Sequence, residues 1–472
     1  MTGFLKLRLW CIVIPLIKIP SMIVAAEAIP NDLPASKLYP KSLAIIEGLK
    51  SHGVNVVSYS CDGTQVERTV QDMLISQAPR TISYRIPDPE GMSHTISLPT
   101  FGNCPVVMIQ DSKHALKTMR NNLFSGARAL VLGNHLTMYS YARDLAFTQL
   151  DGHPLYHRDV EKMDRQDDNA ATRLFSAAAL DFVRKHHSDR LGFATYLFVM
   201  GEVVDAYQSR TIHHCERLRM AFRCRYFLRL WRRFLQAGKY PEAKYYISRE
   251  ANDILEKLVD GLLGLIYVYR DKFEGRYPLL PWLHSTETCE HVFAECRKLI
   301  KDFTHLNFLF MNVRLHTLLR ASLALSRGTD PKARANGYSH TYLDPETAQI
   351  ESLAEFPNDE EVETVAGQAW DEAISLLSLV GIESDDLNTP GSGSRRYGDA
   401  VPNVAEKSDS DHDHPDETEN NYTEESDATW LRRLIGVQET EDWRKVDSPS
   451  QDKMHVLTCA AMALDMNDME VL

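Results

Sequence analysis

The apolar runs in the first 122 residues alternate between strand length and helix length, and this alternation constrains the fold more than any other feature. Apolar runs typical of strands cover residues 7–16, 22–29, 54–63 and 106–110. Amphipathic segments typical of helices cover residues 40–52, 64–76 and 112–122. Residues 78–104, between two of these segments, indicate a loop with a short hairpin. Residues 126–134, after the last segment, indicate a helix end. The order predicts an α/β layer.

From residue 159 onward the pattern changes to long helical periodicity with few strand signals, so the chain as a whole should be predominantly helical. The expected division has five parts. Residues 1–155 form the N-terminal part of an α/β core, 156–280 a helical insertion domain, and 281–378 late helices that return to the core. Residues 379–450 are too acidic and too poor in apolar side chains to fold alone, which predicts a disordered acidic linker. Residues 451–472 form a short C-terminal helix or tail.

The net charge of −13 is concentrated in one segment. Residues 381–430 hold 14 acids against three bases, a balance of −11, so the remainder is nearly neutral. Within that remainder, residues 207–249 hold 11 Lys or Arg against two acids, with interleaved aromatic side chains. This basic stripe suits a polyanion such as DNA. The alternative is a helix face whose bases pair with acids elsewhere in the chain.

The N-terminal segment shares features with a secretory signal, because basic residues precede an apolar stretch and small residues follow it. Pro15, Lys18 and Pro20 split the apolar stretch into two pieces of strand length, which favours two buried strands. Neither piece reaches the about 20 residues of a membrane span. The eight cysteines form no CxxC pair, which favours a reduced, nuclear or intracellular compartment. A secreted or membrane-attached helical protein remains a weaker alternative.

Acidic residues follow two of the apolar strands and begin one late helix. Asp62 ends one strand, Asp111 ends another, and Glu290 lies one helical turn after Glu287. Carboxylates that converge from strand ends and a helix could bind Mg²⁺ or Mn²⁺ for phosphoryl transfer. The structural alternative for each is a helix cap or a turn residue.

Four segments together resemble DDE-type transposases of the P-element and hAT type, which have an RNase H-like core interrupted by a helical insertion. The segments are "SYSCDGTQVERTV" (58–70), "IQDSKHALKTMRNNL" (109–123), "DRQDDNAATRLFS" (164–176) and "STETCEHVFAECRK" (285–298). The second is similar to the "D..H..K..RN" segment of P-element-like transposases, and the fourth to their "S...E..F...R" helix. The resemblance implies an α/β RNase H-like core with an incomplete mixed sheet, a large all-α insertion and an enzyme ancestry that cleaved and joined DNA.

Carried onto this sequence, the resemblance makes Asp62 and Glu290 the catalytic, metal-binding acids, with Asp111 and Glu287 as alternatives. It places Asp62 on the fourth strand of the core and Asp111 on the fifth, where Asp111 orients the helix that follows it. No acid precedes Glu27, so a first-strand Asp is missing from the pattern and activity should be lost or nearly lost. A non-catalytic nucleic-acid-binding or interaction protein is the alternative.

The expected partner is DNA, with a homo-oligomer as an option and with neither a small-molecule cofactor nor a membrane. The residues expected to contact DNA are the bases of the third predicted helix, of the basic stripe and of the late helix: Lys117, Arg120, Arg217, Arg219, Arg223, Arg225, Arg229, Arg232, Arg233 and Arg297.

Overall fold

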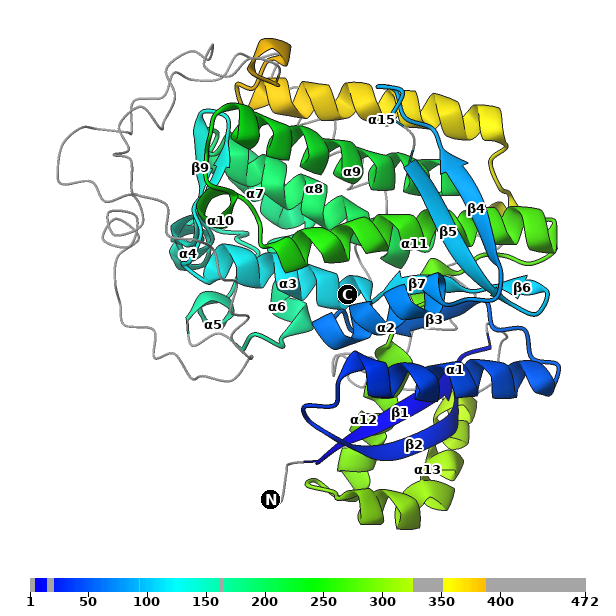
Figure 1. Cartoon of the computed structure of the whole chain (residues 1–472). Helices are drawn as coiled ribbons and strands as arrows, with labels where there is room; N and C mark the ends of the chain where they lie inside the picture. Colours follow the sequence, from blue (N-terminus) through cyan, green and yellow to red (C-terminus); the bar gives the residue numbers. More distant parts are fainter. Residues whose placement is uncertain (1–4, 15–20, 93, 162–163, 326–350, 388–472) are drawn as a thin grey trace.

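The computed structural model describes residues 5–14, 21–92, 94–161, 164–325 and 351–387, and in these residues the chain is mostly helical. Figure 1 shows a helical body above a smaller layer that contains the first strands. The acidic linker from residue 388 and the C-terminal segment 451–472 lie outside the described residues. No helix in the described ranges has the length and apolar character needed to cross a membrane.

The first strands form two separate pairs in the described part of the chain. Strands β1 (Leu5–Ile12) and β2 (Met22–Pro30) are antiparallel. Strands β3 (Ser58–Cys61) and β7 (Val107–Gln110) are parallel, with Cys61 opposite Gln110. The N-terminal segment is therefore a strand pair, as its proline positions predicted. The region 54–63 contributes a strand of four residues only.

Two helices cover one face of both strand pairs. Helix α1 (Ala35–Ser51) begins five residues earlier than the sequence indicated and includes Pro40, and α2 (Gln65–Ser76) begins after Thr64, whose side chain caps it. Side chains from these helices and from both strand pairs share one buried cluster, which includes Trp10 of β1 and Met108 of β7. The two pairs are thus held side by side by a common helical layer.

The segment between α2 and β7 folds back as a hairpin. It consists of β4 (Thr81–Ile86), β5 (His94–Phe101) and the short β6 (Cys104–Pro105), joined in the order β4, β5, β6. After β7 comes α3 (Ser112–Phe124). Residues 126–134, expected to be a helix end, instead lead into a second hairpin of β8 (Leu130–Leu132) and β9 (His135–Thr137). Gly133 turns this hairpin with φ at 58°, a conformation that suits glycine.

The helical body is built around α8 (Leu191–Gln208), which is buried along nearly its whole length. Helices α9 (His214–Ala237), α11 (Arg249–Phe273) and α15 (Asp359–Leu379) pack in the same core. In Figure 1, α15 lies across α9 at the top of the body. Shorter elements complete it: α4 (Tyr139–Phe147), α5 (His157–Val160), α6 (Asp168–Leu174), α7 (Ala177–His186), α10 (Glu242–Tyr245) and the 3-10 turns η1 (Pro281–Leu283), η2 (Ser352–Ala354) and η3 (Ser384–Leu387).

The late helices divide between the two layers. Helices α12 (Glu287–Leu299) and α13 (His305–Leu325) pack on the face of β1 and β2 opposite to α1, around Leu9 and Val292. Helix α15 instead packs against the helical body. One core therefore joins residues from β4 to η3, and α12 and α13 cover the outer side of the first strand pair.

Candidate functional site at the carboxyl ends of β3 and β7

The two strand-end acids lie at the same edge of the parallel pair. Because Cys61 is opposite Gln110, Asp62 and Asp111 are the next residues on neighbouring strands, about 4.8 Å apart in the backbone. The backbone N–H of Asp111 donates to the Cys61 carbonyl at 2.9 Å, which continues the ladder. One oxygen of Asp62 accepts the Thr64 N–H at 3.2 Å, the geometry of an Asx turn.

Asp111 is a buried cap that serves two helices. Its Oδ1 accepts the N–H groups of Lys113 and His114 at the start of α3, at 2.8 and 3.1 Å. Its Oδ2 accepts both the N–H and the hydroxyl of Thr286, at 2.7 and 2.8 Å. Burial alone would raise the pKa of Asp111, but the His114 charge and the Thr286 hydrogen bonds outweigh it and lower the pKa. The carboxylate therefore ties β7 and α3 to the start of α12.

The two acids of α12 also face α3. Glu290 Oε1 lies 2.9 Å from His114 Nε2, and Glu287 Oε1 lies 3.0 Å from Lys113 Nζ. Burial alone would lower the pKa of His114, but the hydrogen bond to Glu290 and the charge of Asp111 raise it overall. The structure thus brings Glu290, Glu287 and Asp111 to one junction, where each already has a partner.

Lys117 and Arg120 do not face a DNA-binding cleft, which corrects the expectation for both. Lys117 is buried and pairs with Asp168 at 2.8 Å. Arg120 is fully buried and donates to the carbonyls of Asp164 and Asp167 at 2.7 and 2.8 Å. These bonds hold the segment 164–176 against α3. All the segments that carry the transposase resemblance consequently meet around β3, β7 and α3.

Three of the carboxylates at this edge are already bonded within the protein. Asp111 accepts four hydrogen bonds, and Glu287 and Glu290 are bonded to cationic or protonatable side chains of α3. Mg²⁺ needs several free carboxylate oxygens to offset its dehydration. Within the described ranges, no three His, Cys, Asp or Glu side chains form a group that could hold a metal. The metal role of Asp62 and Glu290 stays a prediction without a ligand set around it.

Most of the basic stripe is neutralised from within the protein. Arg217 is fully buried and donates to the carbonyls of Ala206 and Ser209, and Arg223 is buried between Glu202 and Glu372. These two have no surface to offer a phosphate, which corrects the expectation for them. The other members of the stripe pair with acids, as the alternative interpretation allowed: Arg219 with Glu216, Arg225 with Asp260, Arg229 with Asp88, Arg232 with Glu242 and Arg233 with Glu90.

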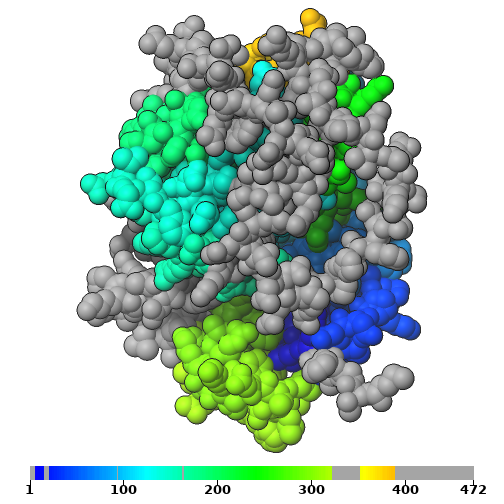
Figure 2. Space-filling model, turned by 90° about the vertical axis from the view of Figure 1, so that its left-hand side faces the viewer, coloured from blue at the N-terminus to red at the C-terminus, as the bar shows by residue number. Residues whose placement is uncertain are grey.

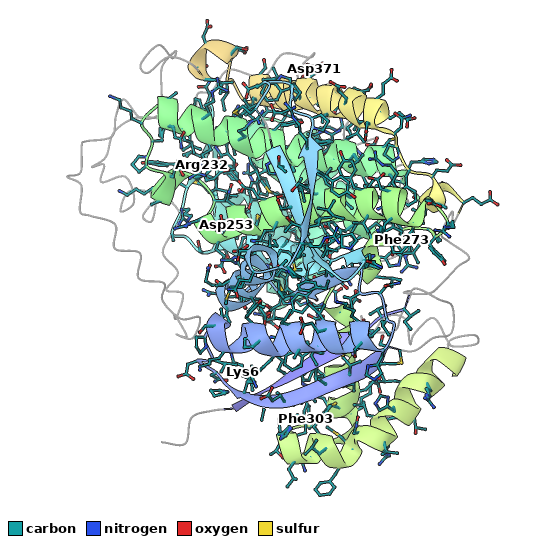
Figure 3. The ribbon with its side chains drawn as sticks, turned by 45° about the vertical axis from the view of Figure 1, so that its right-hand side comes forward. Lys6, Arg232, Asp253, Phe273, Phe303 and Asp371 are labelled. Carbon is teal, nitrogen blue, oxygen red and sulfur yellow. The ribbon has the colours of Figure 1, made fainter. Side chains whose placement is uncertain are left out.

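Arg297 and Arg232, both in the expected DNA-binding set, differ in exposure and in ion pairing. Arg297 lies exposed in the last turn of α12. Arg232 projects from α9 (Figure 3) with a half-exposed side chain, but Glu242 binds its Nε at 2.9 Å. Since a paired guanidinium attracts a phosphate less than an unpaired one, Arg297 is the better candidate for DNA contact.

Sequence reasoning missed the residues that close the junction: Thr286, Lys113 and His114. Thr286 precedes the first residue of α12, but its hydroxyl binds Asp111 rather than its own helix. The one signal in the sequence was a match of charge: the adjacent bases Lys113 and His114 in one helix, and the acids Glu287 and Glu290, three residues apart, in another. His284, nearby, was also missed: its Nδ1 lies 2.7 Å from the Ser58 hydroxyl, and burial lowers its pKa to about 4.

Comparison with known proteins gives little independent information. No protein family and no curated protein matches this sequence. A solved structure titled "Drosophila P element transposase strand transfer complex" is similar in backbone, with a TM-score of 0.44 and 13% identity over 66% of this chain and 68% of that chain. That degree of likeness is too low to assign a fold or an activity.

Replacing Arg223 by Met should destabilise the protein by about 3–5 kcal/mol, because Glu202 is left buried without its partner. The matched change Arg232→Met breaks an exposed pair and should cost about 0–1 kcal/mol. Urea unfolding of both variants measures the difference. An equal decrease in the free energy of unfolding in both variants would show that the buried pair stabilises the protein no more than the exposed pair does.

The pair of His114 and Glu290 should make the α3–α12 junction sensitive to pH. The folded-state pKa of His114 is raised above its ordinary value of 6.5. The protonated ring therefore adds to the free energy of unfolding in full below pH 6.5, and this stabilisation is lost as pH rises through the raised pKa. NMR titration of the His114 ring should show a lower midpoint in Glu290→Gln than in the wild type. Glu295→Gln, which changes a pair with Lys298 on the same helix, should leave the midpoint unchanged. An unshifted midpoint in Glu290→Gln would remove Glu290 as the cause.

Proposed function

We propose that this chain derives from a DDE-type transposase with an RNase H-like core and a helical insertion, and that it acts as a DNA-associated protein without strand-cleaving activity. The observation that supports the proposal is that Asp62 and Asp111 end neighbouring parallel strands, and that Asp111 in turn holds the start of α12, the helix of Glu287 and Glu290. Two-metal phosphoryl transfer requires carboxylates that converge on a pair of metal ions. Acids at two neighbouring strand ends and on a helix that begins beside one of them support descent from such a site.

The contacts of the acids at this edge also support the proposal that DNA cleavage has been lost. A metal-dependent nuclease keeps its carboxylate oxygens free for the metal, whereas here Asp111 caps two helices and Glu290 and Glu287 bind α3. The junction stabilises the contact between α3 and α12. We therefore assign to these acids a structural role in this chain and derive no catalytic step from them.

The second candidate is a nucleic-acid-binding or interaction protein without transposase ancestry. It is favoured by the internal pairing of the basic stripe, which would make these arginines ordinary structural residues of a helical body. The first candidate, and the second in its nucleic-acid-binding form, predict a nuclear or intracellular protein that contacts DNA through surface bases. An interaction protein predicts no such contact. The two candidates differ in whether the strand-end acids have an ancestral metal role.

Incubation of the protein with terminal-repeat DNA and Mg²⁺ or Mn²⁺ should give no nicking above that of Glu290→Ala. The physical reason is that the carboxylates of the junction are already committed to hydrogen bonds and ion pairs. Gel analysis of a supercoiled plasmid that carries the repeat detects single nicks. Nicking by the wild type that Glu290→Ala abolishes would contradict the assignment of a structural role.

DNA affinity should fall steeply with salt concentration and should survive Asp62→Ala and Glu290→Ala. Arg297→Glu should weaken binding several-fold and lower the salt slope by about one, as for the loss of one phosphate contact. Arg232→Glu is the matched control, because Glu242 already neutralises that arginine. Fluorescence anisotropy over a salt series measures all four variants. Absent or salt-independent binding would rule out DNA as the partner.

A further inference from the structure

Cysteines of β1 and α12 meet on the outer side of the first strand pair. Side chains alternate between the two faces of a strand, so Cys11 points to the same side of β1 as Leu9 and packs in the cluster formed with α12. Cys289 lies in the first turn of α12, and Val292 and Cys296 continue the helix face that packs on β1. Figure 2 shows the late helices against the first strands at the lower end of the molecule, as in Figure 1. Folding thus brings together two cysteines that are far apart in the sequence.

The side chains of Cys11 and Cys289 are in direct contact. Their thiols share a hydrogen bond, and the backbone N–H of Cys11 adds a second contact to the Cys289 sulfur. Both side chains are partly exposed, whereas Cys296, two turns further along α12, is buried. Two thiols that touch across an interface have the starting geometry for a disulfide, which forms only where little backbone movement is needed. Their exposure gives a small oxidant access to them.

The surroundings favour ionisation of Cys289 over that of Cys11. The hydrogen bond from the Cys11 thiol lowers the pKa of Cys289; burial opposes this effect, and the positive charge of Arg8 adds to it. Cys289 is also the third residue of α12, where the partial positive charge of the helix N-terminus stabilises a thiolate. The pKa of Cys11 is raised, because its thiol donates that bond and is buried. Since the thiolate is the reactive form, Cys289 is the nucleophile of the pair.

The other cysteines lack this combination of contact and charge. In the parts of the chain that the structure describes, Cys289 is the one cysteine whose pKa is lowered. Burial raises the pKa of five others: Cys61, Cys104, Cys215, Cys224 and Cys296. Cys215 is partly exposed, as Cys289 is, so a comparison of the two separates reactivity from access to solvent.

We propose that Cys289 and Cys11 form an oxidation site for hydroperoxides, in which Cys289 attacks the peroxide and Cys11 then closes a disulfide with it. The Cys289 thiolate attacks one oxygen of hydrogen peroxide, the O–O bond breaks, and the hydroxide that leaves takes up a proton to become water. The Cys11 sulfur then attacks the sulfur of the Cys289 sulfenic acid. The S–S bond forms, and the hydroxyl group leaves as water with the Cys11 proton. Two thiols are oxidised to one disulfide, and one peroxide is reduced to two waters.

The disulfide ties the first strand pair to the start of α12. Asp111 already holds this helix start to β7 and α3 through Thr286. Oxidation adds a covalent link from β1 to the same helix, which opposes local opening of α12. The proposal is independent of the proposed transposase ancestry, because it uses neither the strand-end acids nor a DNA contact.

Disulfide mapping of the full-length protein tests the proposal. The reduced protein is treated with hydrogen peroxide, its remaining thiols are blocked with iodoacetamide, and it is digested with trypsin and a protease that cleaves after Glu. Cleavage after Glu290 and Glu295 separates Cys289 from Cys296. Mass spectrometry should find Cys11 joined to Cys289, and dithiothreitol should remove the link. Cys296→Ser should keep this link, whereas Cys289→Ser should lose it.

The serine variants also separate the roles of the two thiols. In Cys11→Ser the serine hydroxyl can still donate to Cys289, so peroxide should leave a Cys289 sulfenic acid that dimedone labels. In Cys289→Ser, Cys11 should take up several-fold less dimedone. In the untreated wild type at neutral pH, iodoacetamide should alkylate Cys289 several-fold faster than Cys215. Oxidation should slow hydrogen exchange of the α12 amides about tenfold in the wild type and leave it unchanged in Cys289→Ser.

Three results would overturn the proposal. The first is a peroxide-treated wild type in which Cys11 and Cys289 are both recovered as alkylated thiols, or in which Cys11 is joined to another cysteine. The second is equal dimedone labelling of Cys11 in Cys289→Ser and of Cys289 in Cys11→Ser. The third is alkylation of Cys289 no faster than that of Cys215. The first and third measurements use the wild type, so they decide the matter even where a variant has an altered circular dichroism spectrum.

Discussion

The carboxylate of Asp111 is the interaction on which the junction of the two layers depends. It sits at the end of β7, caps α3 through two backbone N–H groups and fixes the start of α12 through Thr286. A buried carboxylate is stable only when hydrogen bonds replace its water, and four donors do so here. Because α3 and α12 are far apart in the sequence, this residue, together with the His114–Glu290 and Lys113–Glu287 contacts, fixes where the late helix lies.

Charged side chains elsewhere in the protein likewise form ion pairs that link one element to another. The arginines of α9 pair with acids from the β4–β5 connection, α8, α11 and α15, for example Arg229 with Asp88 and Arg223 with Glu372. Arg8 of β1 likewise donates to Tyr59 of β3 and pairs with Glu67 of α2, which links the two strand pairs across their helical layer. A stripe that is basic in the sequence is therefore largely neutral in space.

Local elements were predictable where the pattern is strong. The strands 22–29 and 106–110 and the helices after Thr64 and Asp111 lie close to where the sequence indicated them, because apolar spacing and capping residues act over a few positions. Residues 130–137 form a hairpin where the sequence indicates a helix end, because Gly133 signals a turn in either structure. The position of α1 differed because a proline near a helix start does not mark its first residue.

By itself, the sequence determined that strands alternate with helices, that a helical body follows, and that Asp111 begins a helix. Only the tertiary structure decided what the charged residues contact. That Arg223 contacts Glu202, and that Glu290 contacts His114, depends on partners 21 and 176 positions away in the chain. Spacing along a chain reports the face of an element, whereas a charge acquires its role from the opposite charge that folding brings within about 4 Å.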